Sequence, residues 1–433
     1  MPSLLACIAV LSGCGGGGGT STTTTVSTPT PVTTPTACSL TAQTGGIASG
    51  ALAQLNHYRN VTFAGASLSP LLFSADANLT TAAGNHANYL SLLVSPSANV
   101  DPRAHDEVST NPCFTGTTVS ARIAATGNTD SMVGEDFSET SIATSVVSND
   151  ATLAANAGAS IVDGLFNAVY HRMSLLSNFT NAGIAWQKSA NPNLPPTILT
   201  IDLSQHQANT YSNFITYPYS GQTDVLIDWL VDENPCPLGC SNTGALAGFP
   251  ITIQTDGRAL VISSFTVKSA SGSVSGNVLT ATAGTYAADA NLANEHDRAA
   301  FVPLAPLSPN TTYTVTVVGT TGGVAFTQTW TFTTLPITAV QLTSTASTVA
   351  VGGTFDVTFS GGSQNYNSTS PLSWSSVNAS GSSAVSLSYV QLASNSYRFT
   401  YNGNCTLSSG CPVTFTGTDS QGNIGKVQVT VSP

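Results

Sequence analysis

Apolar residues recur at helical spacing in the first half of the chain. Three stretches, 52–59, 79–90 and 159–176, carry them three and four positions apart, which is typical of amphipathic helices. Between and after these stretches, segments 183–187 and 197–203 favour strands. The mixture predicts an α/β domain that covers residues 40–212.

Two-residue alternation replaces the helical pattern after about Tyr217. Four segments between residues 250 and 333 alternate apolar and polar side chains, and a Gly-Gly pair in 320–323 predicts a hairpin between the last two. The part from 301 to 333 resembles the closing strands of a bacterial immunoglobulin-like module, and the last part of the chain shows the same strand rhythm. We therefore predict two immunoglobulin-like β-sandwiches, over 213–335 and 336–433.

A short apolar run stands at the N-terminus. Residues 4–11 are long enough for the core of a signal peptide and too short to span a bilayer. Leu-Ser-Gly-Cys at 11–14 resembles the lipobox of bacterial lipoproteins, which implies cleavage before Cys14 and acylation of its thiol. An ordinary secretory peptide is the alternative. We expect 1–13 to be the signal peptide and the Gly/Thr/Pro-rich segment 14–39 to be a tether.

The cysteines indicate disulfide bonds. Of eight cysteines, Cys7 lies in the expected signal peptide and Cys14 is the expected lipidation site. The even remainder fits an oxidising compartment. Zinc is the alternative for the pair at 236 and 240. The expected disulfides are Cys38–Cys113, Cys236–Cys240 and Cys405–Cys411.

Charge is scarce in this chain. Only 7% of the 433 residues are charged, and the formal net charge is −11. This composition lacks the basic patches that bind nucleic acid or anionic membranes, so it excludes nucleic-acid partners and leaves the lipid as the membrane attachment. We expect a place in the bacterial cell envelope, exposed outside the cytoplasm, which would be the outer membrane in a Gram-negative cell.

Ionisable residues gather in the first domain, which holds five of the six histidines. His-Asp-Glu stands at 105–107, Gly-Glu-Asp at 134–136 and Tyr-His-Arg at 170–172. This order and spacing resembles the CAP superfamily, the cysteine-rich secretory, antigen 5 and pathogenesis-related 1 proteins, in its bacterial SCP-like extracellular branch. The resemblance implies an α-β-α sandwich for this domain.

The resemblance also implies a cleft that holds two histidines and acidic residues. Matched position by position, these are His105, Glu135 and His171, whereas Ala168 takes the place of the family's second Glu. Glu107 is our candidate for the missing carboxylate, because it lies two residues from His105 and on the same face if the segment is extended. The expected ligand-binding cleft is therefore His105, Glu107, Glu135 and His171.

The chemistry of this cleft is open. His105 and His171 could hold a divalent metal such as zinc, with Glu135 as the general base of a metal-assisted, peptidase-like hydrolase. The same groups could bind a ligand without metal, or form a buried hydrogen-bonded network that braces the fold. His86, on the second predicted helix, and Arg122 are expected to be structural.

The sequence favours binding over catalysis, because it nominates no catalytic nucleophile and contains neither an HExxH nor a GxSxG motif. We expect a lipid-anchored bacterial surface protein whose cleft binds a lipid or another small molecule, a peptide or a glycan. The immunoglobulin-like domains would act as a spacer or as an adhesive surface towards a surface or cell-wall partner.

Overall fold

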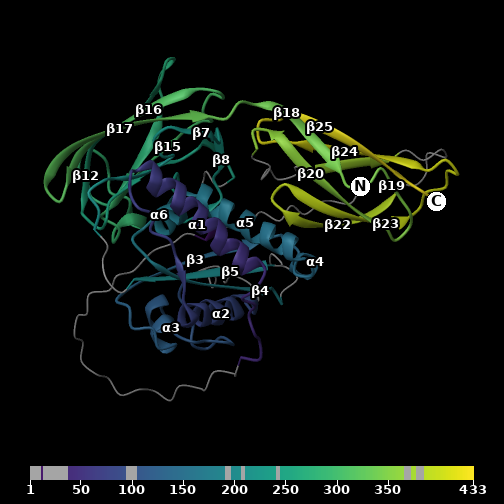
Figure 1. Cartoon of the computed structure of the whole chain (residues 1–433), viewed down its shortest axis with the longest axis horizontal. Coiled ribbons are helices and arrows are strands. Elements are labelled where there is room, and N and C mark those ends of the chain that lie inside the picture. Colours follow the sequence, from purple (N-terminus) through teal and green to yellow (C-terminus); the bar gives the residue numbers. More distant parts are fainter. Residues whose placement is uncertain are drawn as a thin grey trace.

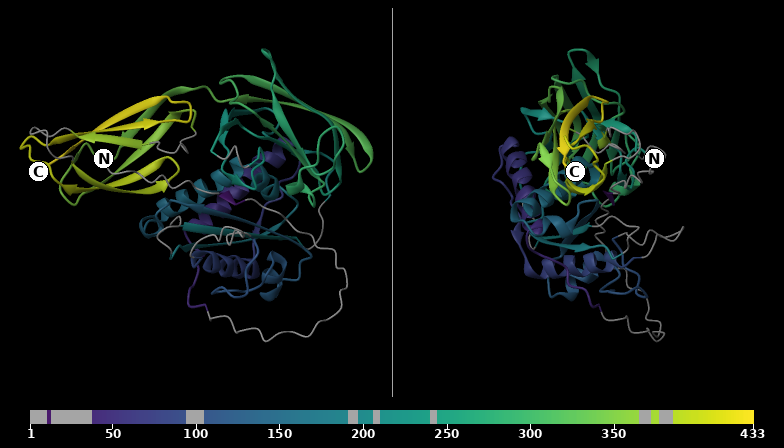
Figure 2. Two further views of the ribbon diagram at one scale, coloured as in Figure 1. Left: turned by 180° about the vertical axis from the view of Figure 1, so that it is seen from behind. Right: turned by 90° about the vertical axis from the view of Figure 1, so that its right-hand side faces the viewer.

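The structure is a computed structural model, and it forms three units that follow one another along the chain (Figure 1). The second β-sandwich projects to one side of the other two units, as the views in Figure 2 also show. The described residues are 11–12, 38–93, 105–190, 197–205, 210–239, 244–364, 372–376 and 385–433.

The first unit is built on a sheet with antiparallel strands at its centre. The sheet continues through two short strands, one from the N-terminus and one from the segment that follows the α/β region. In spatial order its strands are β2 (Ser74–Ala75), β4 (Asn181–Lys188), β5 (Thr197–Gln205), β3 (Met132–Thr140), β1 (Leu11–Ser12) and β9 (Glu233–Asn234).

Helices cover both faces of this sheet. Figure 1 shows α2 and α3 on one side of β3 and β5, and α1, α5 and α6 on the other. Aspartate side chains cap two of them: Asp76 accepts from the backbone N–H of Leu79, and Asp150 from that of Leu153. The helices are α1 (Ile47–Gly65), α2 (Ala77–Ser91), α3 (Val119–Ala125), α4 (Thr144–Val147), α5 (Ala151–Asn167) and α6 (Val169–Leu175).

Glycine allows α1 and α5 to pack closely. A Cβ atom at Gly158 would lie 2.0 Å from the carbonyl oxygen of Ile47, and one at Gly50 would lie 2.3 Å from that of Ala155. The two backbones therefore meet where neither helix has a side chain in the way. This contact fixes the helical layer that carries α6.

The predicted helices at 52–59 and 79–90 are confirmed within α1 and α2, and the strand at 197–203 within β5. The predicted single helix over 159–176 is wrong. Ala168 has an extended backbone, with φ −76° and ψ 153°, so the stretch divides into α5 and α6.

The middle unit is a β-sandwich of two sheets. Its predicted Gly-Gly hairpin is confirmed, because Thr321 pairs with Val324 and the two intervening glycines have positive φ. The unit also contains a separate two-stranded sheet, formed by β8 (Asp228–Leu230) and β10 (Leu246–Gly248). One sheet has the order β14 (Gly276–Thr280), β15 (Arg298–Pro303), β11 (Ile251–Gln254) and β6 (Ile215–Tyr217). The other has the order β13 (Gly272–Ser273), β12 (Leu260–Ser269), β16 (Thr312–Thr321), β17 (Val324–Thr334) and β7 (Gln222–Val225).

The last unit is a second β-sandwich, so the prediction of two all-β units is confirmed. Most of its core is a separate cluster built around Phe355, Phe399 and Phe415, whereas Leu392 packs with the core of the other two units. One sheet has the order β18 (Thr338–Ser344), β20 (Thr354–Gly362), β23 (Ser396–Gly403) and β22 (Ser386–Ala393). The other has the order β19 (Thr348–Val349), β25 (Ile424–Val431), β24 (Cys411–Thr418) and β21 (Leu372–Ser376).

The first two units share one hydrophobic core. Arg172 of α6 crosses their boundary: its guanidinium donates to the carbonyl oxygen of Pro250 at 2.6 Å and stacks on the rings of Tyr217 and Phe249. The predicted boundary at residue 212 thus marks a change from α/β to β structure, but packing continues across it.

Two of the three expected disulfides are confirmed, Cys38–Cys113 and Cys405–Cys411. Cys240 lies outside the described residues, so its pairing with Cys236 stays a prediction, and Cys14 lies outside them as well. In the described part of the chain, no helix is both long enough and apolar enough to cross a membrane.

Candidate functional site

Strand β3 presents two adjacent carboxylates to opposite faces of its sheet. Side chains alternate along a strand, so Glu135 points towards α2 and α3, and Asp136 points towards α6. The neighbours agree with this: His86 of α2 approaches Glu135, and His171 of α6 bonds Asp136. Two separate polar clusters result.

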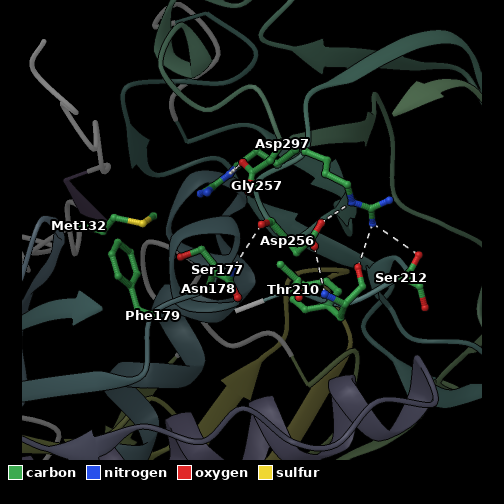
Figure 3. A pocket seen from close by; sticks show the side chains of 12 residues that line it. Met132, Ser177, Asn178, Phe179, Thr210, Ser212, Asp256, Gly257 and Asp297 are labelled. Carbon is green, nitrogen blue, oxygen red and sulfur yellow. Dashed lines mark hydrogen bonds and ion pairs between the residues drawn. The ribbon is translucent and has the colours of Figure 1, made fainter. Parts of the chain in front are cut away.

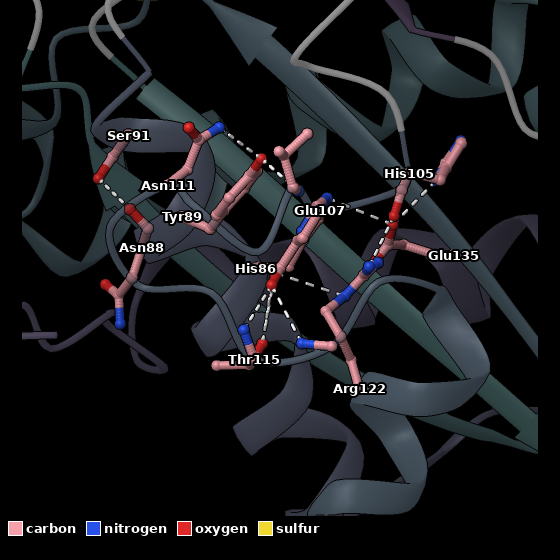
Figure 4. A network of polar contacts seen from close by, with 12 residues as sticks. His86, Asn88, Tyr89, Ser91, His105, Glu107, Asn111, Thr115, Arg122 and Glu135 are labelled. Carbon is pink, nitrogen blue, oxygen red and sulfur yellow. Dashed lines mark hydrogen bonds and ion pairs between the residues drawn. The ribbon is translucent and has the colours of Figure 1, made fainter. Parts of the chain in front are cut away.

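The first cluster surrounds Glu135. His105 Nδ1 lies 2.9 Å from Glu135 Oε1, and Arg122 Nη2 donates to Glu135 Oε2 at 2.6 Å (Figure 4). A further bond, 2.6 Å long, runs from Arg122 Nη1 to the backbone oxygen of His105. Arg122 therefore holds both members of the His105–Glu135 pair in place. Of the four expected cleft residues, these two are thus in direct contact.

Glu107 joins the same cluster through other residues. It accepts from the backbone N–H of Thr115 at 2.6 Å, and His86 Nδ1 lies 3.1 Å from its Oε1. Arg122 Nε is 3.7 Å from that oxygen. Glu107 thus lies in the same cluster, and His86 and Arg122 connect it to Glu135 (Figure 4).

Burial and charge set the protonation of this cluster. Burial would raise the pKa of Glu135, but His86, Arg122 and His105 outweigh it and hold that pKa well below its usual range. Burial lowers the pKa of His86 against the pull of Glu135. Asp202 stands directly opposite Glu135 in β5, and burial, followed by the charge of Glu135, raises its pKa well above the ordinary value. The cluster therefore combines an ionised Glu135 with a carboxyl group that favours its neutral form.

His171 lies in the second cluster, on the other face of β3. Its Nδ1 is 2.7 Å from Asp136 Oδ1, and Ser174 Oγ donates to Asp136 Oδ2 at 2.8 Å. The backbone N–H of His171 donates to Glu233 Oε1 at 3.0 Å. The structure does not bring His171 to His105, because the two histidines bond to successive residues of one strand. The expected four-residue cleft is thus divided.

Sequence reasoning did not place several of the residues that complete these clusters. Asp136 closes the Gly-Glu-Asp motif and received no role, although its place after Glu135 in a strand predicts that it points to the opposite face. Asp202 lies in β5, where the same alternation of side chains along a strand predicts the face to which it points. Glu233 lies 62 positions beyond His171 in the sequence, and no local sequence pattern predicts that contact.

The described residues do not fit the zinc site that the sequence suggested. Among them, no group of three or more His, Cys, Asp or Glu side chains is placed to hold a metal ion. Arg122 already supplies the positive charge beside Glu107 and Glu135, and His171 is on the far side of the sheet. The geometry is that of a buried hydrogen-bonded network of ionisable side chains, and we derive no metal-dependent step from it.

A cavity of about 840 Å³ lies elsewhere, where the α/β unit meets the first sandwich (Figure 3). Met132 and Phe179 line it from one unit, and Asp256 and Arg258 from the other. Arg258 Nε lies 2.5 Å from Asp256 Oδ1, so these two charges balance each other in the wall. None of the four predicted cleft residues lines this cavity.

No protein-family model matches the chain, and no curated protein matches it. Among solved structures, a tandem of titin immunoglobulin domains is 8% identical, covers 49% of this chain and 90% of its own, and has a TM-score of 0.18. Fibronectin(III)-like modules of Clostridium thermocellum CbhA are 11% identical, covering 51% of this chain and 94% of their own, with a TM-score of 0.19. The N-terminal part of the bacterial S-layer protein SbsC is 15% identical, covering 42% and 41%, with a TM-score of 0.21. At these scores, the strand pairing is the evidence for the sandwich architecture.

Proposed function

We propose that this chain is a lipid-anchored bacterial surface protein, in which a CAP-like α/β unit binds a ligand at the His105–Glu135 pair. The pair carries the proposal because it joins the Glu135 carboxylate, which is held by Arg122, to a partly exposed imidazole. The His105 side chain is 16% exposed, whereas Glu135 is fully buried. A ligand would therefore meet the imidazole, and Glu135 would orient it from below.

The protonation of Glu135 favours binding over catalysis. A general base works best when its pKa lies near the working pH, whereas the pKa of Glu135 is held far below it. Its Oε2 is also taken by Arg122. Such a carboxylate is suited to hold the His105 imidazole in position. The ligand classes left open by the sequence are lipids, peptides and glycans.

The covalent arrangement supports display at a surface. Disulfide Cys38–Cys113 ties the end of the expected tether to the segment that follows His105 and Glu107. A lipid on Cys14 would then hold the α/β unit near the membrane through the tether, whose far end is fixed to that unit by the disulfide. The two weakly charged sandwiches would extend the chain towards a surface or cell-wall partner.

Mass spectrometry of the protein from bacterial membranes tests the anchor. The expected N-terminal residue is a diacylated Cys14, and a Cys14→Ser variant should leave the membrane fraction. A mature protein that begins elsewhere, or that carries an unmodified Cys14, would contradict the anchor.

Nuclear magnetic resonance of the His105 imidazole tests the binding site. The probes are vesicles of phosphatidylethanolamine and cholesterol, soluble muropeptides, and a hexapeptide library. At least one should shift the His105 signals, and His105→Ala should abolish that binding. His57→Ala is the matched control, because His57 is exposed on α1. Binding that survives His105→Ala, or the absence of binding by all three probes, would refute the site.

A further inference from the structure

The N-terminal segment fills a place in the central sheet. Leu11 and Ser12 form β1, which lies between β3 and β9. It pairs antiparallel to β3, with Leu11 opposite Ser138 and Ser12 opposite Phe137, and parallel to β9, opposite Glu233 and Asn234. Two residues of the expected signal peptide thus join two strands of the folded unit.

The proposed processing would empty this place. Cleavage before Cys14 removes Leu11 and Ser12, and the facing edges of β3 and β9 then lose their partner. Backbone N–H and C=O groups at such an edge need new partners, and an unpaired edge readily accepts another strand. We call the gap between residues 137–138 of β3 and 233–234 of β9 the β1 slot.

Both walls of the slot are held independently of β1. On one side, β3 pairs with β5 along its whole length, from Met132 to Thr140. On the other, the Glu233 side chain accepts from the backbone N–H groups of Val169, Tyr170 and His171. Removal of β1 therefore leaves two anchored walls, with the spacing of a single strand between them.

We propose that the β1 slot of the mature chain binds an extended peptide segment of another protein by strand addition. This inference rests on the proposed function and selects peptides among its ligand classes. The main chain of the peptide would supply the hydrogen bonds, which a lipid tail cannot do and which a glycan cannot repeat at strand spacing.

The surroundings define the chemistry of the peptide. Phe137, Ser138 and Glu233 are 0%, 3% and 1% exposed, and the Glu233 carboxylate is already engaged by α6. A charged residue in the middle of the peptide would be buried there without a counter-ion, so we expect two consecutive uncharged residues at this point.

The slot also adjoins the proposed site. The rings of Phe137 and His105 are 5.2 Å apart, centre to centre. A peptide residue opposite Phe137 would share its face of the sheet and lie towards His105. Occupation of the slot should therefore be felt at the imidazole.

Fluorescence anisotropy with a labelled hexapeptide of residues 8–13, Ile-Ala-Val-Leu-Ser-Gly, tests the slot. Two oxidised chains are compared, 14–433 and 1–433, each with Cys14→Ser so that neither is processed. We expect the shorter chain to bind at least about tenfold more tightly, because in the longer chain β1 competes for the slot. The same peptide should shift the His105 signals of the shorter chain.

Two altered peptides separate strand addition from apolar adhesion. Methylation of the backbone nitrogens of Leu11 and Ser12 keeps the side chains and removes the donors, and should weaken binding at least about tenfold. Lysine at both positions should do the same. No binding to 14–433, equal binding by both chains, or undiminished binding of the methylated peptide would overturn the inference. Because this assay needs no lipid, an unacylated Cys14 in cells would refute the anchor and leave the slot result unaffected.

Discussion

Glu233 accepts a hydrogen bond from the backbone N–H of Tyr170 at 2.7 Å, across 63 positions of sequence. Its carboxylate also accepts from Val169 and His171, so it satisfies the first turn of α6. At the other end of this helix, Arg59 Nη1 donates to the carbonyl oxygens of Leu175 and Ser177. An anion at the N-terminus and a cation at the C-terminus both suit the helix dipole. The short helix that carries His171 is thus held from outside at both ends.

Glu233→Gln should destabilise the α/β unit and the first sandwich together. Glu233 Oε2 accepts from Val169, and a glutamine amide in that place would set a donor against a donor. We expect a loss of about 1–3 kcal/mol in the free energy of unfolding, measured by urea titration. Asp224→Asn, at an exposed position, is the control and should change it little. Loss of helical signal with an intact first sandwich would contradict the shared core.

Arg122→Met should be among the most damaging substitutions in the α/β unit. It leaves Glu135 and Glu107 buried without their guanidinium, and removal of one partner of a buried pair costs about 3–5 kcal/mol. Arg122→Lys should lose less, because it keeps the charge and loses the forked geometry. Both are read from urea unfolding curves at neutral pH.

Arg258→Met is the matched control for Arg122→Met. The Arg258 side chain is 37% exposed, so its pair with Asp256 is screened by solvent and should contribute no more than about 1 kcal/mol. If the two methionine variants were equally stable, the buried carboxylates around Glu135 would not depend on Arg122 in the way proposed here.

Local sequence patterns predicted helices and strands well. They failed where a residue distant in the sequence determines where a helix begins. The spacing in 79–90 predicted α2, because α2 buries one face against the sheet and begins at its own cap, Asp76. The stretch 159–176 was predicted as one helix, since its apolar spacing continues through Ala168. The break appears where Glu233 caps a new helix, and that residue is far outside any window of the pattern.

In the candidate site, too, some contacts could be predicted from the sequence and others could not. The family resemblance placed His105 and Glu135 in one cleft, and the two are in contact. Glu107 was the candidate for a further carboxylate because it lies two residues from His105. The place of His171 could not follow from order alone. Once 132–140 is a strand, alternation separates Glu135 from Asp136, and each histidine follows its own carboxylate. The register of β3 therefore decides which residues share a face.

The two confirmed disulfides should differ in their contributions to stability. Cys38–Cys113 spans 75 positions and Cys405–Cys411 spans 6, so the first restricts the unfolded chain more. In the chain-entropy relation, the larger loop is worth about 2 kcal/mol more. The paired Cys→Ser variants are compared by hydrogen exchange, with peptides from α2 reporting on the first disulfide and peptides from β23 on the second. Equal losses of protection would contradict this ranking.

Asp202→Asn should stabilise the protein at high pH and not at low pH. Burial and Glu135 raise the pKa of Asp202 above its ordinary value of 3.8. For an acid whose pKa is raised by folding, the stabilising contribution is complete below the unfolded pKa and is lost as pH rises through the folded pKa. Asparagine stays neutral at every pH, so the variant does not lose this stabilising contribution as pH rises. Urea unfolding at pH 5 and pH 8 should therefore show a gain over the wild type that grows with pH. Exposed Asp224→Asn is the control and should give no such trend; a gain for Asp202→Asn that is the same at both values would show that Asp202 does not titrate within the network.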